Sequence, residues 1–97
     1  MPIRPSQTPP ETLERWAQRR REVGARIRSL RLDRGLSQEA LALEAGLSRN
    51  MVIGMEWGRK SVAYERLWDI ADVLGTDVRN LLAPYPSHTS DATPTAR

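Results

Sequence analysis

The chain has 97 residues, a formal net charge of +3, no cysteine and one histidine, His88. This length allows one small domain, and the lack of cysteine excludes disulfides and thiolate metal centres. No apolar run approaches the roughly 18 residues of a membrane span. We therefore expect a protein with no membrane partner, no bound metal and no cofactor.

Residues 1–10 lack the apolar core of a secretory signal, so we expect a cytoplasmic location. The chain also lacks a glycine-rich phosphate loop and a carboxylate pair in an acid–base setting, so we do not expect an enzyme.

Arginine is concentrated in one segment. Residues 15–34 hold eight arginines against two acidic residues, a balance of +6, whereas residues 35–85 have a balance of −2. Scattered cations would be interpreted as a solvated helix face. A concentration this strong in one segment favours an anionic polymer as the partner.

The N-terminal part is expected to be a disordered tail followed by a long helix. Residues 1–10 hold four prolines, and the helix is expected over residues 11–34. Residues 11–20 form either an extension of the domain's first helix or a separate short helix. Gly24 weakens the continuous alternative by about 1 kcal/mol. The helical prediction rests on one stripe at spacings of three and four residues: Leu13, Trp16, Arg20, Val23, Ile27 and Leu30.

Two short helices joined by a tight turn are expected next, over residues 37–45 and 49–57. The small side chain of Ala42 lets a second helix cross closely. Gly46 can adopt the positive φ of a sharp helix exit, and Ser48 is a good N-cap for the helix that follows. This pattern predicts a helix-turn-helix unit.

Two more helices are expected, over residues 64–74 and 77–82. Gly75 stops the first of them, Thr76 caps the second, and residues 84–97 are expected to be a disordered tail. No segment alternates polar and apolar residues with a period of two, so the predicted fold is all-α. The predicted core is apolar: Val23, Ile27, Leu30, Leu36, Leu41, Ala42, Leu47, Val52, Met55, Leu67, Ile70, Leu74, Val78 and Leu81.

The central segment resembles the helix-turn-helix of the Xre / lambda-repressor-like (Cro-type) family of transcriptional regulators. The resemblance covers about residues 23–82. It implies a five-helix lambda-repressor-like DNA-binding domain over residues 11–83, with residues 11–20 as a helical extension. The residues that carry it are Gln38, Ala42, Gly46, Val52, Met55 and the pair Glu56 and Gly58.

The first exposed side chains of the second short helix are expected to be those of Arg49 and Asn50. In a helix-turn-helix such positions meet base edges in the major groove. Arginine can bond guanine O6 and N7 together, and asparagine can bond adenine N6 and N7. The resemblance adds Ile53, which can pack on a thymine methyl, and Gly54, which lets a partner approach the backbone.

Further positions are expected to hold the DNA backbone or to brace the domain. The resemblance implies a salt bridge between Arg31 and Glu56 that ties the first helix to the third. The expected phosphate contacts are Gln38, Ser48, Arg28, Trp57, Arg59 and Lys60.

Relatives of this kind usually act as dimers, so the resemblance implies a homodimer. The candidate contacts are Trp68, Leu81 and Leu82, with Trp16 as an added one. Leu81 is interpreted as core first, and Trp16 is expected to pack on its own domain.

The resulting hypothesis is a regulator of transcription, a repressor, that binds double-stranded DNA and has no evident small-molecule domain. Phage repressor, restriction-modification controller and antitoxin are not separable from the sequence. The alternative is a protein-interaction adaptor or antitoxin-like partner that uses the apolar surface of Met51, Ile53 and Trp57.

Overall fold

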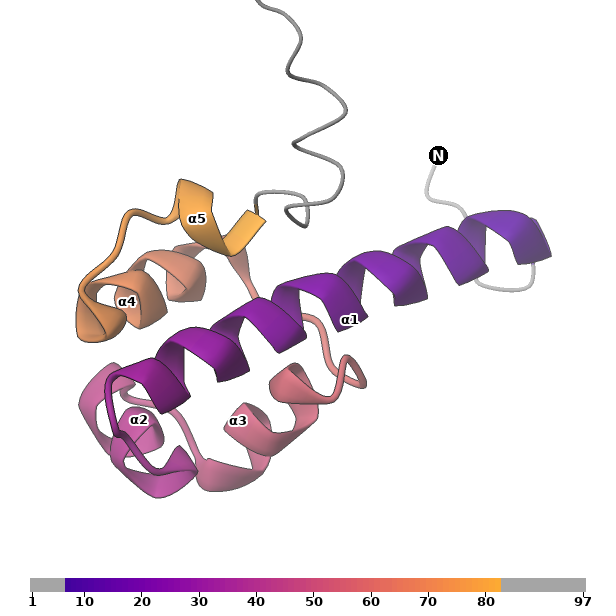
Figure 1. Ribbon diagram of the computed structural model, residues 1–97. Coiled ribbons are helices and arrows are strands. Elements are labelled where there is room, and N and C mark those ends of the chain that lie inside the picture. The colour runs from indigo at the N-terminus through magenta and orange to yellow at the C-terminus, as the bar shows by residue number, and fades with distance from the viewer. Residues whose placement is uncertain (1–6, 83–97) are drawn as a thin grey trace, which may run out of the picture.

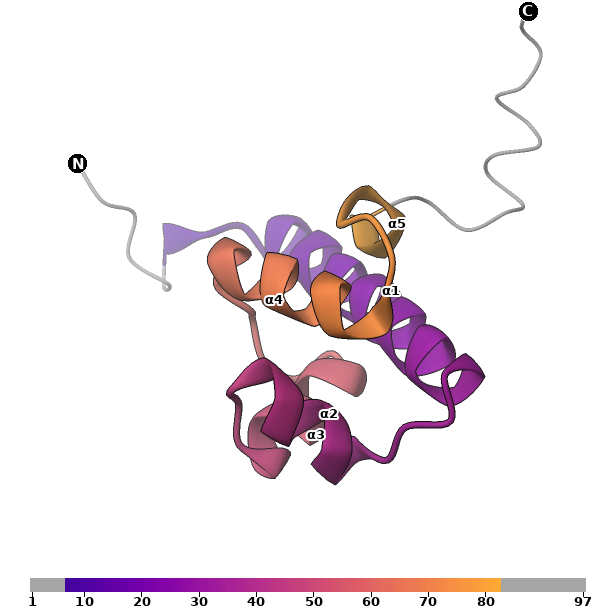
Figure 2. The same cartoon turned by 90° about the vertical axis from the view of Figure 1, so that its left-hand side faces the viewer.

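The structure is a computed structural model that describes residues 7–82, and all regular structure in this range is helical. Helices α2 and α3 lie on one side of the molecule and α4 and α5 on the other, with the long α1 alongside both pairs (Figures 1 and 2). This arrangement confirms the predicted all-α fold. The five helices are α1 (Pro10–Asp33), α2 (Gln38–Ala45), α3 (Arg49–Glu56), α4 (Tyr64–Leu74) and α5 (Arg79–Leu82).

The first helix is continuous from Pro10 to Asp33, so residues 11–20 extend it and do not form a separate helix. Gly24 lies inside it, where a Cβ atom would collide with the backbone carbonyl oxygens of Met55 and Glu56. The glycine is therefore explained by close packing, because only a residue without a Cβ lets the end of α3 come this near to α1.

The caps of the helix-turn-helix form as predicted. The Ser37 hydroxyl accepts a hydrogen bond from the Ala40 N–H at 2.9 Å, and the Ser48 hydroxyl accepts one from the Met51 N–H at 3.0 Å. Gly46 has a φ of 71°, the left-handed conformation that ends α2. Helix α2 starts one residue later than predicted and α3 ends one residue earlier.

The hydrophobic core joins residues of all five helices. Ala45 and Ala71, on the apolar faces expected for their helices, are buried as well, and five members of the predicted core are only partly buried. The partly buried ones lie at the edges of the core: Val23, Leu30, Leu36, Leu47 and Val78. The buried apolar residues are Ile27, Leu41, Ala42, Ala45, Val52, Met55, Leu67, Ile70, Ala71, Leu74 and Leu81.

The last helix is shorter than predicted and has a different cap. It begins at Arg79, whose N–H donates to the Asp77 carboxylate at 2.8 Å. The Thr76 hydroxyl accepts from the Asn80 side-chain amide at 2.7 Å instead. Side-chain hydrogen bonds from Arg79 hold the pKa of Asp77 below its ordinary value. Asp77, not Thr76, therefore caps the start of the helix.

Two placements fall outside or against the expectations for the ends of the chain. Most of the two predicted tails, and His88 with them, lies outside the described residues 7–82. Only residues 7–10 of the N-terminal tail are described, and α1 already begins at Pro10. Trp16 is 45 % exposed and does not belong to the core, so the structure does not support the expectation that it packs on its own domain.

Two further properties concern residues 7–82 alone. No helix in this range is both long enough and apolar enough to cross a bilayer. Within the same range, no group of three or more His, Cys, Asp or Glu side chains is arranged to hold a metal ion.

Candidate nucleic-acid interface

Helix α3 presents one exposed face. Arg49 and Asn50 in its first turn are exposed, Ile53 is half-buried, and Trp57 at its C-cap is 64 % exposed. Residues three and four apart share a side of a helix, so Ile53 joins the first turn to Trp57. Val52, on the other side, is fully buried. The outer face of α3 is therefore a continuous strip with Arg49 and Asn50 at its leading end.

Gly54 does not belong to this exposed strip. It is buried, and a Cβ atom on it would lie 2.7 Å from Cγ and Cδ of Lys60. Its carbonyl oxygen accepts the N–H groups of Arg59 at 2.8 Å and Lys60 at 3.2 Å. The expectation that Gly54 lets a base approach the backbone is corrected, because the alkyl chain of Lys60 covers this position.

The C-terminal end of α3 is fastened to α1. The Arg20 Nε donates to the Gly58 carbonyl oxygen at 3.2 Å, which explains why a polar residue interrupts the apolar stripe of α1. Gly58 has a φ of 73°, and a Cβ atom there would lie 2.8 Å from the Cα of Arg21. The turn after α3 therefore packs directly on the backbone of α1.

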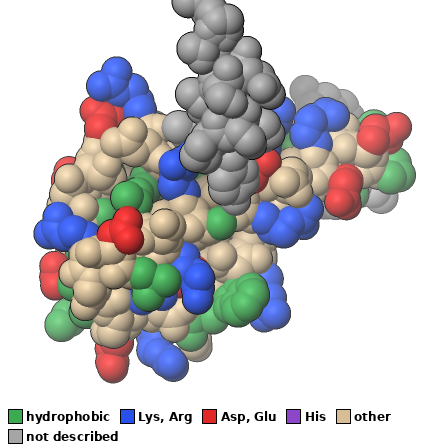
Figure 3. Space-filling model, in the orientation of Figure 1, with side chains coloured by type: hydrophobic (Ala, Val, Ile, Leu, Met, Phe, Trp, Pro, Cys, Tyr) green, Lys and Arg blue, Asp and Glu red, His purple; other side chains and the backbone are tan. Residues whose placement is uncertain are grey.

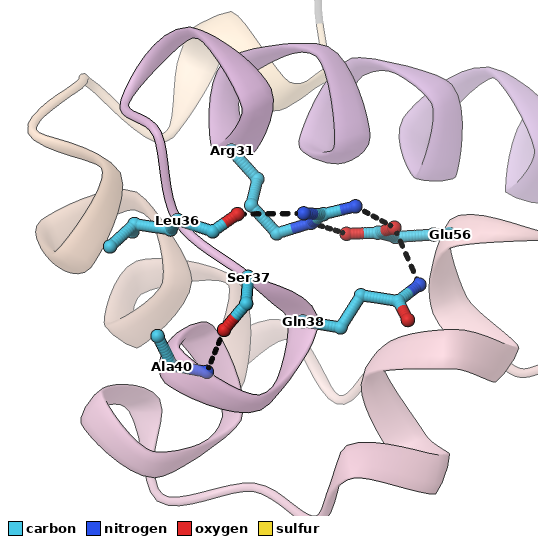
Figure 4. A network of polar contacts seen from close by, with 6 residues as sticks. All are labelled: Arg31, Leu36, Ser37, Gln38, Ala40 and Glu56. Atoms are coloured by element: carbon cyan, nitrogen blue, oxygen red, sulfur yellow. Dashed lines mark hydrogen bonds and ion pairs between the residues drawn. The ribbon is translucent and has the colours of Figure 1, made fainter.

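A buried ionic network holds α3 against α1 and α2 (Figure 4). The Arg31 Nε and Nη2 atoms donate to the Glu56 carboxylate at 2.6 and 3.0 Å, and Arg31 Nη1 donates to the Leu36 carbonyl at 2.7 Å. The two side chains are only 8 % and 1 % exposed. The structure thus contains the ion pair expected between Arg31 and Glu56.

Two of the expected phosphate contacts already have hydrogen bonds inside the protein. The Gln38 Nε2 donates to Glu56 Oε1 at 3.1 Å, which leaves one amide hydrogen for another acceptor. The Ser48 hydroxyl oxygen caps α3, and its own hydrogen remains able to donate. Both side chains are therefore oriented by the fold.

Cationic side chains gather beside Trp57. Arg28 is exposed, and the Arg59 guanidinium carbon lies 5.9 Å from the centre of the Trp57 ring. The sequence analysis missed Arg21, which shares this region. Its spacing of seven residues from Arg28, two helical turns, is the signal that could have identified it. An open cavity of about 390 Å³ lies here, lined by Arg21, Ala25, Arg28, Glu56 and Trp57.

The residues expected at a dimer contact differ in their exposure. Trp68 and Leu82 are 53 % and 56 % exposed, and the Trp68 ring meets Tyr64 edge to face with the ring centres 6.1 Å apart. Leu81 is 1 % exposed and belongs to the core of its own domain. The structure therefore confirms the interpretation of Leu81 as a core residue first.

Comparison with known proteins agrees with this geometry. The profile of the family HTH_3, described as helix-turn-helix, matches residues 27–81. A curated relative, the uncharacterized HTH-type transcriptional regulator y4dJ of Sinorhizobium fredii, is 31 % identical over 65 residues. This alignment covers 67 % of the chain and 84 % of the relative.

Solved structures with the same architecture include a controller protein and a DNA-binding domain. The restriction-modification controller protein C.AhdI of Aeromonas hydrophila is 37 % identical with a TM-score of 0.65, covering 67 % of this chain and 94 % of that one. The BldD DNA-binding domain of S. venezulae is 28 % identical with a TM-score of 0.62, covering 68 % and 99 %.

The match to the family spans more than half of the chain, and both the ion pair and the capped turn lie within it. The chain therefore belongs to the helix-turn-helix family HTH_3, the Xre/lambda-repressor-like transcriptional regulators, and has the DNA-binding fold of that family.

Proposed function

We propose that this protein is a cytoplasmic, sequence-specific regulator of transcription that reads double-stranded DNA by placing α3 in the major groove. The observation that carries the proposal is the outer strip of α3. Its first-turn polar side chains are exposed, while its other end is fastened to α1 through the buried Arg31–Glu56 pair. A reading helix needs both features, since its side chains must reach bases from a fixed position.

The base contacts follow from the chemistry of the strip. Arg49 bonds guanine O6 and N7, Asn50 bonds adenine N6 and N7, and Ile53 packs on a thymine methyl group. Each good bidentate contact discriminates against a wrong base by about 1–3 kcal/mol. With Gly54 covered by Lys60, three side chains remain as the proposed readers.

The phosphate contacts surround this strip. Arg28 and Arg21 lie on one face of α1 beside Trp57, whose indole N–H can donate to a phosphate oxygen. Arg59 and Lys60 follow in the next turn. The remaining contacts come from the starts of the two short helices, where free backbone N–H groups suit an anion: Gln38 and Ser48.

We propose that the protein binds as a homodimer through the exposed face of Trp68 and Leu82. Two copies would then meet half-sites about one helical turn apart, roughly 34 Å. We propose that the protein represses transcription and does not activate it, because a repressor can act by occupying a promoter, which requires only DNA binding.

Selection of sites from random DNA tests the readers. We expect Arg49→Ala to lose its preference at one guanine and Asn50→Ala at one adenine, each by about 1–3 kcal/mol. Arg79→Ala, at an exposed arginine of α5, is the matched control and should keep the wild-type preference. An unchanged consensus in both reader variants would contradict the proposed contacts.

The salt dependence of binding tests the phosphate contacts separately. Each contact should contribute about 0.9 to the slope of log K against log salt, so Arg28→Ala should lower the slope by about one while leaving the base preference intact. A protein that binds no duplex at low salt would favour the adaptor role, in which Met51, Ile53 and Trp57 meet another protein.

A further inference from the structure

The N-terminal part of α1 projects beyond the rest of the domain (Figure 1). Leu13 and Trp16 in this projection are each 45 % exposed. Their spacings of seven and four residues from Arg20 place them on the side of α1 that carries Val23 and the fully buried Ile27. The apolar side of α1 that contributes to the core thus continues outward onto its N-terminal part, where both apolar side chains are exposed.

A cavity opens where this stripe reaches the domain. Its volume is about 220 Å³, and it lies between α1, the α3–α4 connection and the start of α4. Its apolar wall comes from Val23, Ile27, Val62 and Leu67, and its charged lining residues are all basic: Arg19, Arg20 and Lys60. The chemistry of the cavity fits an apolar side chain that is accompanied by carboxylates.

The projecting part of α1 has this chemistry. Its first two turns carry Glu11 and Glu14 beside Leu13, against a single basic residue, Arg15. Acidic and hydrophobic side chains are exposed together at its tip, and basic ones appear where it meets the domain (Figure 3). A parallel pair of such helices would align like charges, whereas an antiparallel pair aligns opposite ones.

We propose that two copies of this chain associate through α1 in an antiparallel pair with its two-fold axis near Ala17. Leu13 of one copy then lies beside residue 21 of the other, next to the apolar cavity, and Glu14 lies near the second copy's Arg19 and Arg20. The same segment supplies the inserted side chain and the cavity, which is the self-complementarity of a two-fold interface.

This surface is separate from the proposed Trp68 and Leu82 face, so it can join two dimers. The association does not require DNA, and its failure is therefore distinguishable from failure of the proposed DNA binding.

Light scattering on the full chain without DNA measures the association. The wild type should have at least twice the 11.0 kDa mass of one chain, and Trp16→Glu should have half the wild-type mass. Leu43→Glu is the matched control, because Leu43 is 83 % exposed on α2, and it should keep the wild-type mass. Equal masses for the wild type and Trp16→Glu at every concentration would overturn the proposal. The exposed apolar side of α1 would then be covered by another part of the chain or by another protein.

Cross-linking measures the orientation. The chain has no cysteine, so single variants can be joined at one position with a short bis-maleimide. Ala17→Cys lies at the proposed axis and should cross-link in high yield. Leu13→Cys lies on the same side of α1 four residues away, so its two copies are separated along the helix by about 12 Å at 1.5 Å per residue, and its yield should be several-fold lower. Equal yields at both positions, as a parallel pair would give, would overturn the antiparallel arrangement.

Discussion

Removing one member of the Arg31–Glu56 pair should destabilise the domain strongly. In Glu56→Ala, the Arg31 guanidinium would stay buried and keep only its bond to the Leu36 carbonyl. Breaking a buried ion pair in this way costs about 3–5 kcal/mol. For a domain of 60–100 residues each kcal/mol lowers the melting temperature by about 4–8 °C, so we expect a fall of at least about 12 °C.

The double replacement Arg31→Met with Glu56→Met should be less harmful than the sum of the single changes Arg31→Met and Glu56→Met. It removes both charges and keeps much of the buried volume, and such replacements are often neutral. Here the Leu36 carbonyl and the Gln38 amide each lose a partner, at about 1–3 kcal/mol for each group left buried. The double variant should therefore remain destabilised, but by less than the sum of the singles.

Urea unfolding followed by far-ultraviolet circular dichroism measures all four proteins of this cycle. Wild type, both single variants and the double variant should show the same dependence on urea, so that differences in midpoint report differences in stability. If the two single losses simply add in the double variant, the two side chains are energetically independent and the reasoning is refuted.

Three other changes test the local structure. Ser48→Ala removes the cap of α3 and should cost about 1 kcal/mol in thermal unfolding; no loss would mean that water replaces the hydroxyl. Gly24→Ala should destabilise despite a better helix propensity, by about 1–3 kcal/mol, and an increase in melting temperature would contradict the close packing. Because the pKa of Asp77 is lowered by Arg79, its contribution to stability should be present above the unfolded-state pKa and lost as the pH falls through the folded-state value. Asp77→Asn should flatten this acid limb of the stability profile, and an unchanged limb would assign it to other groups.

The helix-turn-helix could be predicted because its signals are local. Ser37 and Ser48 each accept from an N–H three residues later, and Gly46 turns the chain by itself. None of these features needs a distant partner. The placement of Arg49 and Asn50 on the exposed side followed from the same short-range pattern.

The corrected positions depend on neighbours that are distant in sequence or on a choice between equal candidates. The stripe of α1 predicted a helix but not where the domain ends, so Trp16 was expected to pack on a domain whose core does not include it. The cover over Gly54 comes from the path of the following turn. Thr76 and Asp77 can both cap a helix, and the sequence alone does not choose between them.

The attachment of α3 has a consequence for how sites on a promoter are spaced. Gly24, Arg20 and Arg31 fix α3, the proposed reading helix, to the same long helix α1 that carries the proposed contact between copies. Copies joined through α1 would keep their reading helices in a set rotational phase around the duplex. Inserting about five base pairs between two adjacent operators, half of the 10–10.5 base pairs of a turn, should abolish cooperative occupancy, and inserting a whole turn should restore it.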